Sequence, residues 1–417
     1  MELMPGYKRS DVGVIPDDWD AKPLGDIGDS LIGLTYRPSE VRKYGTLVLR
    51  SSNVQNGTLC FDDNVFVDAD IPDRIMVRPG DILVCVRNGS RDLIGKSALI
   101  DERAVGMTFG AFMAVFRSEH GKLLHHVFQS GIFKKQINEH LGATINQITN
   151  KSLNSFKVPL PPTDEERTEI ANALSDVDAL LATLDQVIAK KRDLKQATMQ
   201  QLLTGETRLP GFSGNWEVKQ LGDIGQFLKG RGVKKDEAQS GTLPCIRYGE
   251  IYTHHNDYIK SFNSWISPQV AATAMRLKQG DLLFAGSGET KEEIGKCVAF
   301  IDDCEAYAGG DTVILRAAGI NPMFMGYYCN TAPIAAQKAS KGQGDAVVHI
   351  SAVALSSIVL ALPSLSEQNA IATVLSSMDS ELSVLESRRD KTRNIKQAMM
   401  QELLTGKTRL VEGGYDG

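Results

Sequence analysis

The strongest constraint on this chain is that its second half repeats its first half. The segment Asp193–Leu209 (DLKQATMQQLLTGETRL) is almost identical to Asn394–Leu410 (NIKQAMMQELLTGKTRL), and the equivalent residues Lys195 and Lys396 lie 201 positions apart. Solenoid repeats have periods of about 20 to 50 residues, whereas this period has the length of a domain. The 417 residues therefore predict two copies of one unit rather than a repeat array.

Two further pairs of segments match at nearly the same spacing. The motif WDAKPLGDIG, which starts at Trp19, matches WEVKQLGDIG, which starts at Trp216. The stretch PGDILVCVRNGSRDLIGK from Pro79 matches QGDLLFAGSGETKEEIGK from Gln279. Together with the first pair, these matches indicate that each copy consists of a globular part followed by a long helix.

Each long helix has sequence signals at both ends. Thr163–Glu166 and Ser364–Glu367 are capping boxes, and prolines lie just upstream of both, where they do not interrupt a helix. Gly205 and Gly406 suit the left-handed conformation that often ends a helix. A helix of about 40 residues between these signals is about 60 Å long, at 1.5 Å per residue.

Apolar side chains recur at heptad spacing along both helices. Because one narrow stripe per helix has to be covered, the pattern predicts that the two helices pack on each other as an antiparallel coiled coil. The alternative is that each helix packs separately on its own globular part. The residues predicted to pair are Ile170, Leu174, Val177, Leu181, Leu184, Ile188, Ile371, Leu375, Met378, Leu382 and Leu385.

The globular parts combine strands with helices. Short apolar runs such as Asp81–Val86 and Thr312–Leu315 are typical of strands, while Leu123–Leu141 and Pro322–Ala339 have helical character. We therefore predict two α/β (α+β) domains in a pseudo-twofold internal repeat. The expected division is a first globular domain at 1–157, a central helical region at 158–210, a second globular domain at 211–358 and a C-terminal helical region at 359–417.

Charge and composition exclude several classes. The chain has 46 Lys and Arg against 51 Asp and Glu, a net charge of -5, which argues against non-specific coating of nucleic acid but allows local binding surfaces. No run of about 18 apolar residues indicates a membrane span. The N-terminus carries Glu2, Lys8 and Arg9 without an apolar signal core, so we expect a cytoplasmic protein with no membrane partner.

Catalytic and metal-binding motifs are not evident in the sequence. The triplet Gly95-Lys96-Ser97 follows a predicted strand as a phosphate-binding loop would, but the glycine required five residues earlier is Ser90. The cysteines form no CxxC pair, and adjacent histidines are expected to point apart. We find no nucleophile elbow and no adenine-methyltransferase motif, so we predict no catalytic residue and no metal. A nucleotide-hydrolysing enzyme at Gly95-Lys96-Ser97 and a coiled-coil adaptor without DNA binding are the alternatives.

The repeated motifs resemble those of the specificity (S) subunit of type I restriction-modification enzymes. They are the proline-rich leads into the capped helices (LPPTDEERTEIANAL and LPSLSEQNAIATVL), the helix ends that carry LLTG-TRL, and the openings with LGDIG. The resemblance covers almost the whole chain. One mild departure is Glu166-Arg167, where this family usually has Glu-Gln, as at Glu367-Gln368.

This resemblance implies a non-catalytic DNA-recognition subunit. Each globular domain would be a target recognition domain that reads one half of a bipartite, asymmetric sequence in double-stranded DNA. The helices would set the spacer and dock two methyltransferase subunits, and restriction subunits would join the complex. This chain would carry no cofactor: S-adenosylmethionine would lie on the methyltransferase, which methylates adenine at N6, and ATP and Mg on the restriction subunit.

Polar and basic loops in both domains are candidates for DNA contacts, because such side chains bind base edges and phosphates. The alternative for each residue is a solvated surface position. In the first domain we select Arg37, Arg42, Lys43, Arg50, Asn53, Arg87, Asn88, Ser90, Arg91, Asn146, Gln147 and Lys151. In the second we select Lys229, Arg231, Lys234, Lys235, Arg247, Tyr248, Ser287, Lys291, Lys341 and Gln343.

Overall fold

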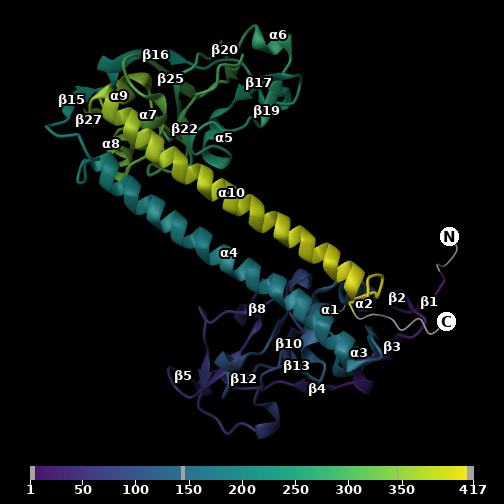
Figure 1. Cartoon of the computed structure of the whole chain (residues 1–417). Helices are drawn as coiled ribbons and strands as arrows, with labels where there is room; N and C mark the ends of the chain where they lie inside the picture. The colour runs from purple at the N-terminus through teal and green to yellow at the C-terminus, as the bar shows by residue number, and fades with distance from the viewer. Residues whose placement is uncertain (1–4, 142–145, 345, 411–417) are drawn as a thin grey trace. The chain divides into compact units, whose positions relative to one another are not determined.

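The computed structural model describes residues 5–141, 146–344 and 346–410 (Figure 1). It divides into two compact units, of which unit 1 comprises Met1–Asp185 with Ser387–Gly417 and unit 2 comprises Gln186–Glu386. Each unit therefore contains one globular part together with segments of both long helices. Within the described residues, no helix combines the length and the apolar character that a membrane crossing requires.

The globular part of unit 1 is built on two four-stranded sheets. The first is antiparallel, with the order β11 (Ser97–Leu99), β10 (Ile82–Cys85), β13 (Met113–Arg117) and β4 (Asp29–Ile32). The second has the order β12 (Thr108–Phe109), β6 (Thr46–Leu49), β9 (Phe66–Val67) and β5 (Val41–Arg42), with β12 and β6 parallel. Smaller pairs are β1 (Tyr7–Ser10) with β2 (Gly13–Pro16), β3 (Asp20–Pro23) with β14 (Lys157–Leu160), and β7 (Val54–Gln55) with β8 (Thr58–Leu59). The helices are α1 (Gly121–Gln129), α2 (Gly131–Leu141) and α3 (Asn150–Ser155).

Unit 2 has a related arrangement. Its five-stranded sheet has the order β16 (Gly225–Lys229), β25 (Thr312–Ala317), β21 (Leu282–Ala285), β23 (Cys297–Ala299) and β18 (Asp257–Tyr258). Its four-stranded sheet has the order β19 (Ser264–Ile266), β17 (Leu243–Ile246), β24 (Tyr307–Ala308) and β20 (Met275–Arg276), with β17 and β24 parallel. Smaller pairs are β15 (Glu217–Gln220) with β27 (Val359–Leu362) and β22 (Ser287–Gly288) with β26 (Val348–His349). The short helices are α5 (Tyr248–Thr253), α6 (Pro268–Ala271), α7 (Pro322–Tyr328), α8 (Ala332–Lys341) and α9 (Ala352–Ser356).

Single turns of 3₁₀ helix connect many of these elements. In unit 1 they are Leu24–Asp26, Pro38–Glu40, Ser51–Asn53, Asp73–Ile75, Arg91–Leu93 and Glu102–Ala104, and in unit 2 they are Leu221–Ile224 and Lys235–Glu237. Leu24–Asp26 and Leu221–Ile224 are the two copies of the LGDI motif. Their leucines are buried, which explains why the motif is present in both halves of the sequence.

The same buried ion pair supports the central sheet of each unit. Arg117 of β13 donates to both carboxylate oxygens of Asp81, at 2.8 and 2.7 Å. Arg316 of β25 donates in the same way to Asp281, at 2.9 and 2.7 Å. Each aspartate also accepts from the backbone amide three residues earlier, and so closes the turn before β10 or β21. Because strands and helices occur together in each globular part, the predicted mixed α/β character is confirmed.

The two long helices are α4 (Asp164–Thr204) and α10 (Leu365–Leu403). Their predicted starts are confirmed, because the amides of Glu166 and Glu367 donate to the capping hydroxyl groups three residues earlier, at 3.2 and 3.3 Å. Their predicted ends are confirmed as well, since Gly205 and Gly406 have φ of 74° and 68°, the left-handed region that suits glycine.

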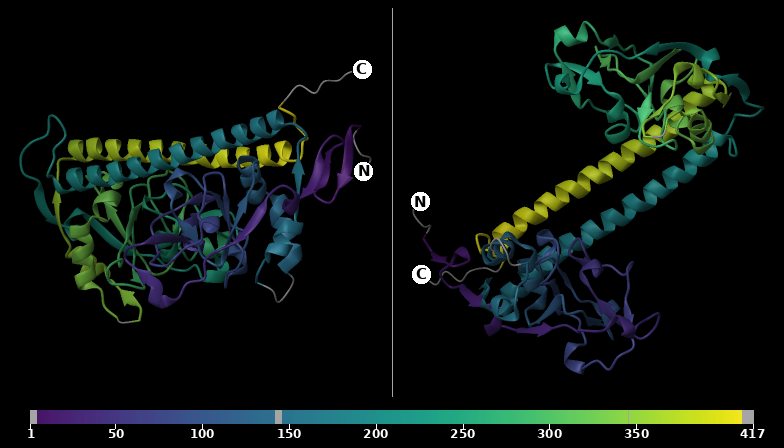
Figure 2. Two further views of the ribbon diagram at one scale, coloured as in Figure 1. Left: turned by 90° about the horizontal axis from the view of Figure 1, so that it is seen from below. Right: turned by 180° about the vertical axis from the view of Figure 1, so that it is seen from behind.

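Ion pairs join the segments of α4 and α10 that share a unit, and these segments lie side by side (Figure 2). In both units the α10 partner moves back along the chain as the α4 partner advances, so the facing segments run antiparallel. The pairs are Asp178–Lys396 (2.6 Å) and Asp185–Arg389 (3.8 Å) in unit 1, and Lys191–Glu381 (2.7 Å) and Lys195–Asp379 (2.8 Å) in unit 2.

The predicted pairing residues differ in their surroundings. Ile170 and Leu174 belong to the globular core of unit 1, together with Leu403 and Leu404 at the end of α10. The equivalent Ile371 and Leu375 belong to the globular core of unit 2, together with Leu202 and Leu203 at the end of α4. The helix ends are thus covered by globular domains as well as by the other helix. Along the rest of the stripe, Leu184, Ile188 and Leu382 are buried, and Val177, Leu181, Met378 and Leu385 are half-buried.

An arginine just beyond each long helix ties it to the start of the other. Arg208 and Arg409 form charge-assisted hydrogen bonds with the buried capping-box glutamates Glu367 and Glu166, respectively. Each guanidinium also lies 5.8 Å from the ring centroid of the tryptophan that opens the neighbouring domain. This interaction is present once in each unit, and it explains the repeated TRL ending.

Candidate nucleic-acid interface

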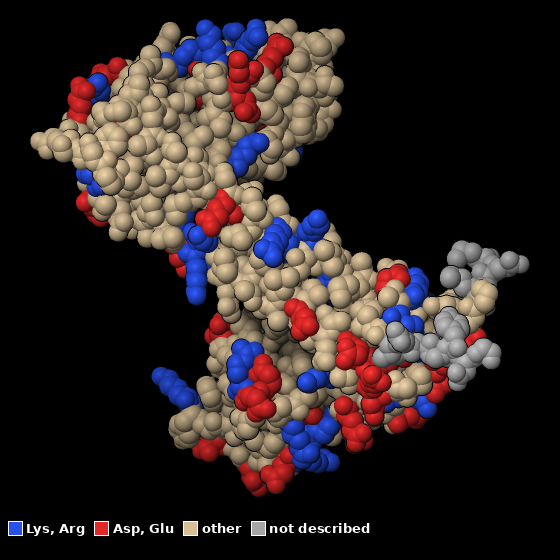
Figure 3. All heavy atoms as spheres, viewed as in Figure 1, with Lys and Arg blue, Asp and Glu red and all other residues tan. Residues whose placement is uncertain are grey.

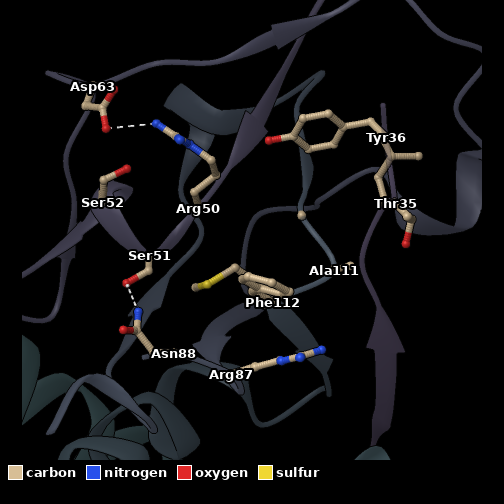
Figure 4. A pocket seen from close by; sticks show the side chains of 13 residues that line it. Thr35, Tyr36, Arg50, Ser51, Ser52, Asp63, Arg87, Asn88, Ala111 and Phe112 are labelled. Carbon is tan, nitrogen blue, oxygen red and sulfur yellow. Dashed lines mark hydrogen bonds and ion pairs between the residues drawn. The ribbon is translucent and has the colours of Figure 1, made fainter. Parts of the chain in front are cut away.

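A cavity of about 560 Å³ opens on unit 1 where several strands end (Figure 4). Arg50 follows β6, Arg87 and Asn88 follow β10, and Phe112 lies just before β13. Because neighbouring strands bring their ends together, residues far apart in the sequence meet here. The lining residues are Leu34, Thr35, Tyr36, Arg50, Ser51, Ser52, Asp63, Arg87, Asn88, Gly110, Ala111, Phe112 and Met113.

Arg50 is held at one side of this cavity. Its Nη2 lies 2.8 Å from Oδ2 of Asp63, while its Nε is buried and has no hydrogen-bond partner among the described residues. The carboxylate thus holds the guanidinium in place through Nη2. Asn53 behaves differently from its prediction as a DNA contact. It is fully buried, its Oδ1 accepts from the Arg50 amide, and its Nδ2 donates to the carbonyl groups of Cys60 and Asp63. Asn53 therefore shapes the loop and leaves no edge exposed to DNA.

Arg87 and Asn88 form the opposite side of the cavity. The Arg87 guanidinium lies 5.0 Å from the centroid of the Phe112 ring, and both side chains are exposed. The Asn88 amide donates to Ser51 Oγ at 3.2 Å and accepts from the amide of Ser90 at 3.0 Å. A single β-bridge also pairs Arg87 with Gln147. Four of the predicted residues, Arg50, Arg87, Asn88 and Gln147, are thus brought together.

The remaining candidates of unit 1 lie on other loops. Their side chains are exposed, and they do not line this cavity. They are Arg37, Arg42, Lys43, Ser90, Arg91, Asn146 and Lys151. The sequence analysis did not select Tyr36, Asp63 and Phe112, because nothing near them in the sequence shows that their loops converge with those of Arg50 and Arg87. The available signal for Phe112 was an aromatic residue in the segment Gly110–Phe112 between two strands. In the structure Phe112 is 57% exposed.

In unit 2 the arginine that follows the equivalent strand is Arg247. Its amide donates to Glu250 at 3.1 Å, just as the amide of Arg50 donates to Asn53 at 2.9 Å, so the two loops begin alike. Ser287 was predicted to contact DNA, but it is buried and shares a 2.9 Å hydrogen bond with Nδ1 of His349. Its hydroxyl group therefore stabilises the loop and is not exposed to DNA. Arg247 and Lys341 are half-buried, and the exposed candidates are Lys229, Arg231, Lys234, Lys235, Tyr248, Lys291 and Gln343.

Charge is distributed unevenly over the visible face of the molecule (Figure 3). On unit 2, Lys and Arg side chains gather over the region of β16 and β20, whereas on unit 1 both signs are interspersed. A local group of cations on an acidic chain is the arrangement expected of a protein that binds nucleic acid only through specific loops.

The glycine-lysine triplet does not form a phosphate-binding loop. The amide of Gly95 donates to the carbonyl group of Cys85 at 2.8 Å, and the amide of Lys96 donates to that of Leu93 at 3.4 Å. A phosphate-binding loop needs free amides and a following helix, whereas here the strand β11 follows. The nucleotide-hydrolysing alternative is therefore not supported.

The adjacent histidines of α1 do not point apart as expected. The ring centroids of His125 and His126 are 5.1 Å apart. With Asp178 of α4 they form a group in which one potential ligand atom from each residue lies within 4.8 Å of the others. Burial lowers the pKa of His125 to about 3 and that of His126 to about 4. Both rings are therefore neutral at physiological pH.

Comparison with known proteins is consistent with this arrangement. A family model described as "Type I restriction modification DNA specificity domain" matches residues 16–190 and 213–392. The putative type I restriction enzyme MjaX specificity subunit of Methanocaldococcus jannaschii is 26% identical over 438 residues, with 97% of each chain covered. The type I restriction enzyme EcoKI specificity subunit of Escherichia coli is 25% identical, over 68% of this chain and 65% of that one.

Two solved structures have a similar fold. The crystal structure of the type I restriction-modification S subunit from M. genitalium has a TM-score of 0.61 at 15% identity and covers 97% of this chain and 98% of that one. A chain from a structure on the complex assembly and conformational transition of the type I R-M system has a TM-score of 0.53 at 17% identity, with 94% and 99% covered.

Proposed function

The chain belongs to the type I restriction-modification DNA specificity family, and on that basis we propose that each unit reads one half of a bipartite, asymmetric DNA target. The recognition domains would be residues 1–157 and 211–358, with the helical regions 158–210 and 359–417 between and after them. The chain would act on DNA in the cytoplasm, without a cofactor or catalytic residue of its own. Its partners would supply S-adenosylmethionine for methylation, and ATP and Mg for restriction.

The observation that carries this proposal is the cavity of unit 1. Arg50, Arg87 and Asn88 meet there, and guanidinium and amide groups are the side chains that most often bind base edges in the major groove. Asp63 pre-orients Arg50, which lowers the entropic cost of binding. The exposed Phe112 adds an apolar surface next to Arg87, of the kind that contacts a thymine methyl group.

Unit 2 supports the second half of the proposal. Arg247 occupies the place of Arg50, and a group of cations lies nearby in the sequence at Lys229, Arg231, Lys234 and Lys235. The other loop residues differ between the units, since Arg87 is matched by Ser287 in the aligned repeats and Asn53 is matched by Glu250. Different loops on the same framework are expected to bind different half-sites, which makes the whole target asymmetric.

The long helices would set the distance between the half-sites. We propose that α4 and α10 form an antiparallel coiled coil related by a pseudo-twofold axis. The antiparallel order of ion pairs within each unit and the buried Leu184, Ile188 and Leu382 support this pairing. Two readers that approach the same face of a duplex need half-site centres about 34–36 Å apart, which is one helical turn.

The helices also offer a repeated apolar position for partner binding. Leu194 on α4 is 53% exposed, and the equivalent Ile395 on α10 is 47% exposed. Large apolar side chains at equivalent, exposed positions in both copies are suited to two identical partners. We propose that each of them contributes to the docking of one methyltransferase subunit, and that restriction subunits join through these.

The proposal is tested by mapping methylated adenines after co-expression with the methyltransferase. Arg50→Ala should relax the target at one half-site only, and Arg247→Ala at the other half-site only. Loss of a base contact of this kind costs about 1–3 kcal/mol, or roughly 5- to 150-fold in affinity for the preferred sequence. Arg103→Ala, an exposed arginine outside the cavity, should change neither half. An unaltered target in both recognition variants would contradict the assignment of these loops.

A further inference from the structure

The loop that precedes β25 in unit 2 places Asp311 at the position that Phe112 holds in unit 1. The carbonyl group of Phe112 accepts from the amide of Val86 at 3.1 Å, and the carbonyl group of Asp311 accepts from the amide of Gly286 at 2.7 Å. Val86 and Gly286 are equivalent, because they directly follow the matched strands β10 and β21. The same hydrogen bond therefore fixes both loops, although one presents an apolar ring and the other a carboxylate.

Asp311 lies on the same surface of unit 2 as two arginines. The amide two residues before Asp311 donates to the carbonyl group just before Arg247, at 2.9 Å. The amide just before Asp311 donates to the carbonyl group just after Arg231, at 3.0 Å. Arg247 and Asp311 are also the equivalents of two residues that line the cavity of unit 1. The loop therefore belongs to the surface that is proposed to read DNA.

No contact within the fold accounts for the carboxylate of Asp311. The residue is exposed, and within the described part of the chain its carboxylate forms no hydrogen bond and no ion pair, with Arg231 and Arg247 included. Asp281, in contrast, binds Arg316 and closes a turn. Asp311 also has a φ of 58°, a left-handed conformation that aspartate adopts more readily than most residues. The loop thus exposes a carboxylate that is free to bind another molecule.

A carboxylate on a surface that reads DNA discriminates among the four bases. Near the phosphate backbone it weakens binding, because the two negative charges repel each other. A hydrogen bond from a base edge offsets this cost. In the major groove, cytosine and adenine present amino groups that can donate, whereas guanine and thymine present acceptors. A half-site with a suitable amino group is therefore favoured over one without it.

We propose that Asp311 is a specificity-determining residue of unit 2, which accepts a hydrogen bond from N4 of one cytosine in the half-site. This inference rests on the proposed reading of DNA by unit 2. Adenine fits less well, because it also presents the N7 acceptor, which repels a carboxylate. Arg247 on the same surface favours a guanine. In unit 1, Phe112 has no acceptor group and suits a thymine methyl group instead, so the exchange gives the two half-sites different bases.

The test maps methylated adenines after co-expression of the full chain with the methyltransferase, and measures binding of the purified complex to duplexes that vary at each target position. The parent should require C at one position of the half-site that Arg247→Ala relaxes. Asp311→Gly removes the carboxylate and tolerates the left-handed φ, so it should reduce the preference for C there by about fivefold or more. Asp311→Asn, whose amide can pair with N6 and N7 of adenine, should change the preference from C to A.

The matched control is Asp303→Asn, which removes the same charge from unit 2. Asp303 is exposed and lies before β24, whereas Asp311 lies after it, so the control should leave the target unchanged. The inference is overturned if the Asp311 variants keep the parental base preference, even where they bind every sequence more tightly, because that result would show only relief of charge repulsion. If Arg247→Ala still alters the target in that case, this inference alone fails. If none of these variants alters it, the proposed reading of DNA by unit 2 fails as well.

Discussion

Lowering the pH should destabilise unit 1 through its buried histidines. Burial is the main cause that lowers the pKa of His125 to about 3 and that of His126 to about 4, and the nearby Lys396 ammonium acts in the same direction. In the unfolded chain both rings have a pKa of about 6.5. Between pH 7.5 and 5.0 the unfolded state therefore binds protons at these two rings, whereas the folded state does not. Because the folded pKa values are depressed, stability is present above the unfolded pKa and is lost as the pH falls.

The magnitude follows from the difference between the two states. At pH 5.0 each ring is about 1.5 pH units below its unfolded pKa, which favours unfolding by about 2 kcal/mol per histidine. Both rings together amount to about 4 kcal/mol, a large part of the roughly 5–15 kcal/mol that stabilises a typical domain. Asp178, the acidic group that faces the rings, acts weakly in the opposite sense on His125.

The assay is urea unfolding of the full chain at several pH values. The parent is compared with His125→Gln/His126→Gln, and His120→Gln serves as the control on the neighbouring cap position. The free energy of unfolding should fall by about 4 kcal/mol more in the parent than in the double variant between pH 7.5 and 5.0. His255, whose pKa is also lowered by burial, is present in all three proteins and cancels. Equal pH dependence in the parent and the double variant would refute the reasoning.

Two further predictions concern the long helices. Four residues inserted after Thr183 lengthen α4 by about 6 Å, so the preferred DNA spacer should grow by one or two base pairs in methylation mapping, and an unchanged spacer would rule out the helices as a ruler. Leu194→Glu and Ile395→Glu should each reduce the number of bound methyltransferase subunits from two to one, as measured by the mass of the purified complex, and two subunits retained by the double variant would place docking elsewhere.

Local signals predicted the framework well. The capping boxes at Thr163 and Ser364 and the glycines Gly205 and Gly406 each act within one helical turn, so the sequence states their structural effect directly. The repeat strengthened each assignment, because the same signal appears twice at one spacing.

The site depended on contacts that local signals do not report. Arg50 and Arg87 line one cavity because β6 and β10 belong to different sheets whose ends converge. No sequence pattern around either residue predicts this convergence. Asn53 was selected for its residue type, yet its side-chain amide is fully hydrogen-bonded to the backbone of its own loop. The histidine pair was judged by helical spacing alone. Its environment comes from Asp178 and Lys396, which lie about 50 and 270 positions further along the chain.

The comparison of the two copies separates framework from specificity. Pairs that have the same chemistry in both units, such as Asp81–Arg117 with Asp281–Arg316, hold strands and helices in place. Positions that differ occupy loops or pockets where the framework tolerates change. A bipartite reader needs two scaffolds that assemble alike and two surfaces that bind unlike sequences. A buried position can also change its chemistry and keep its structural role, because His126 lies against Ser175 of α4, whereas the equivalent Tyr327 donates a hydrogen bond to Asp379 of α10.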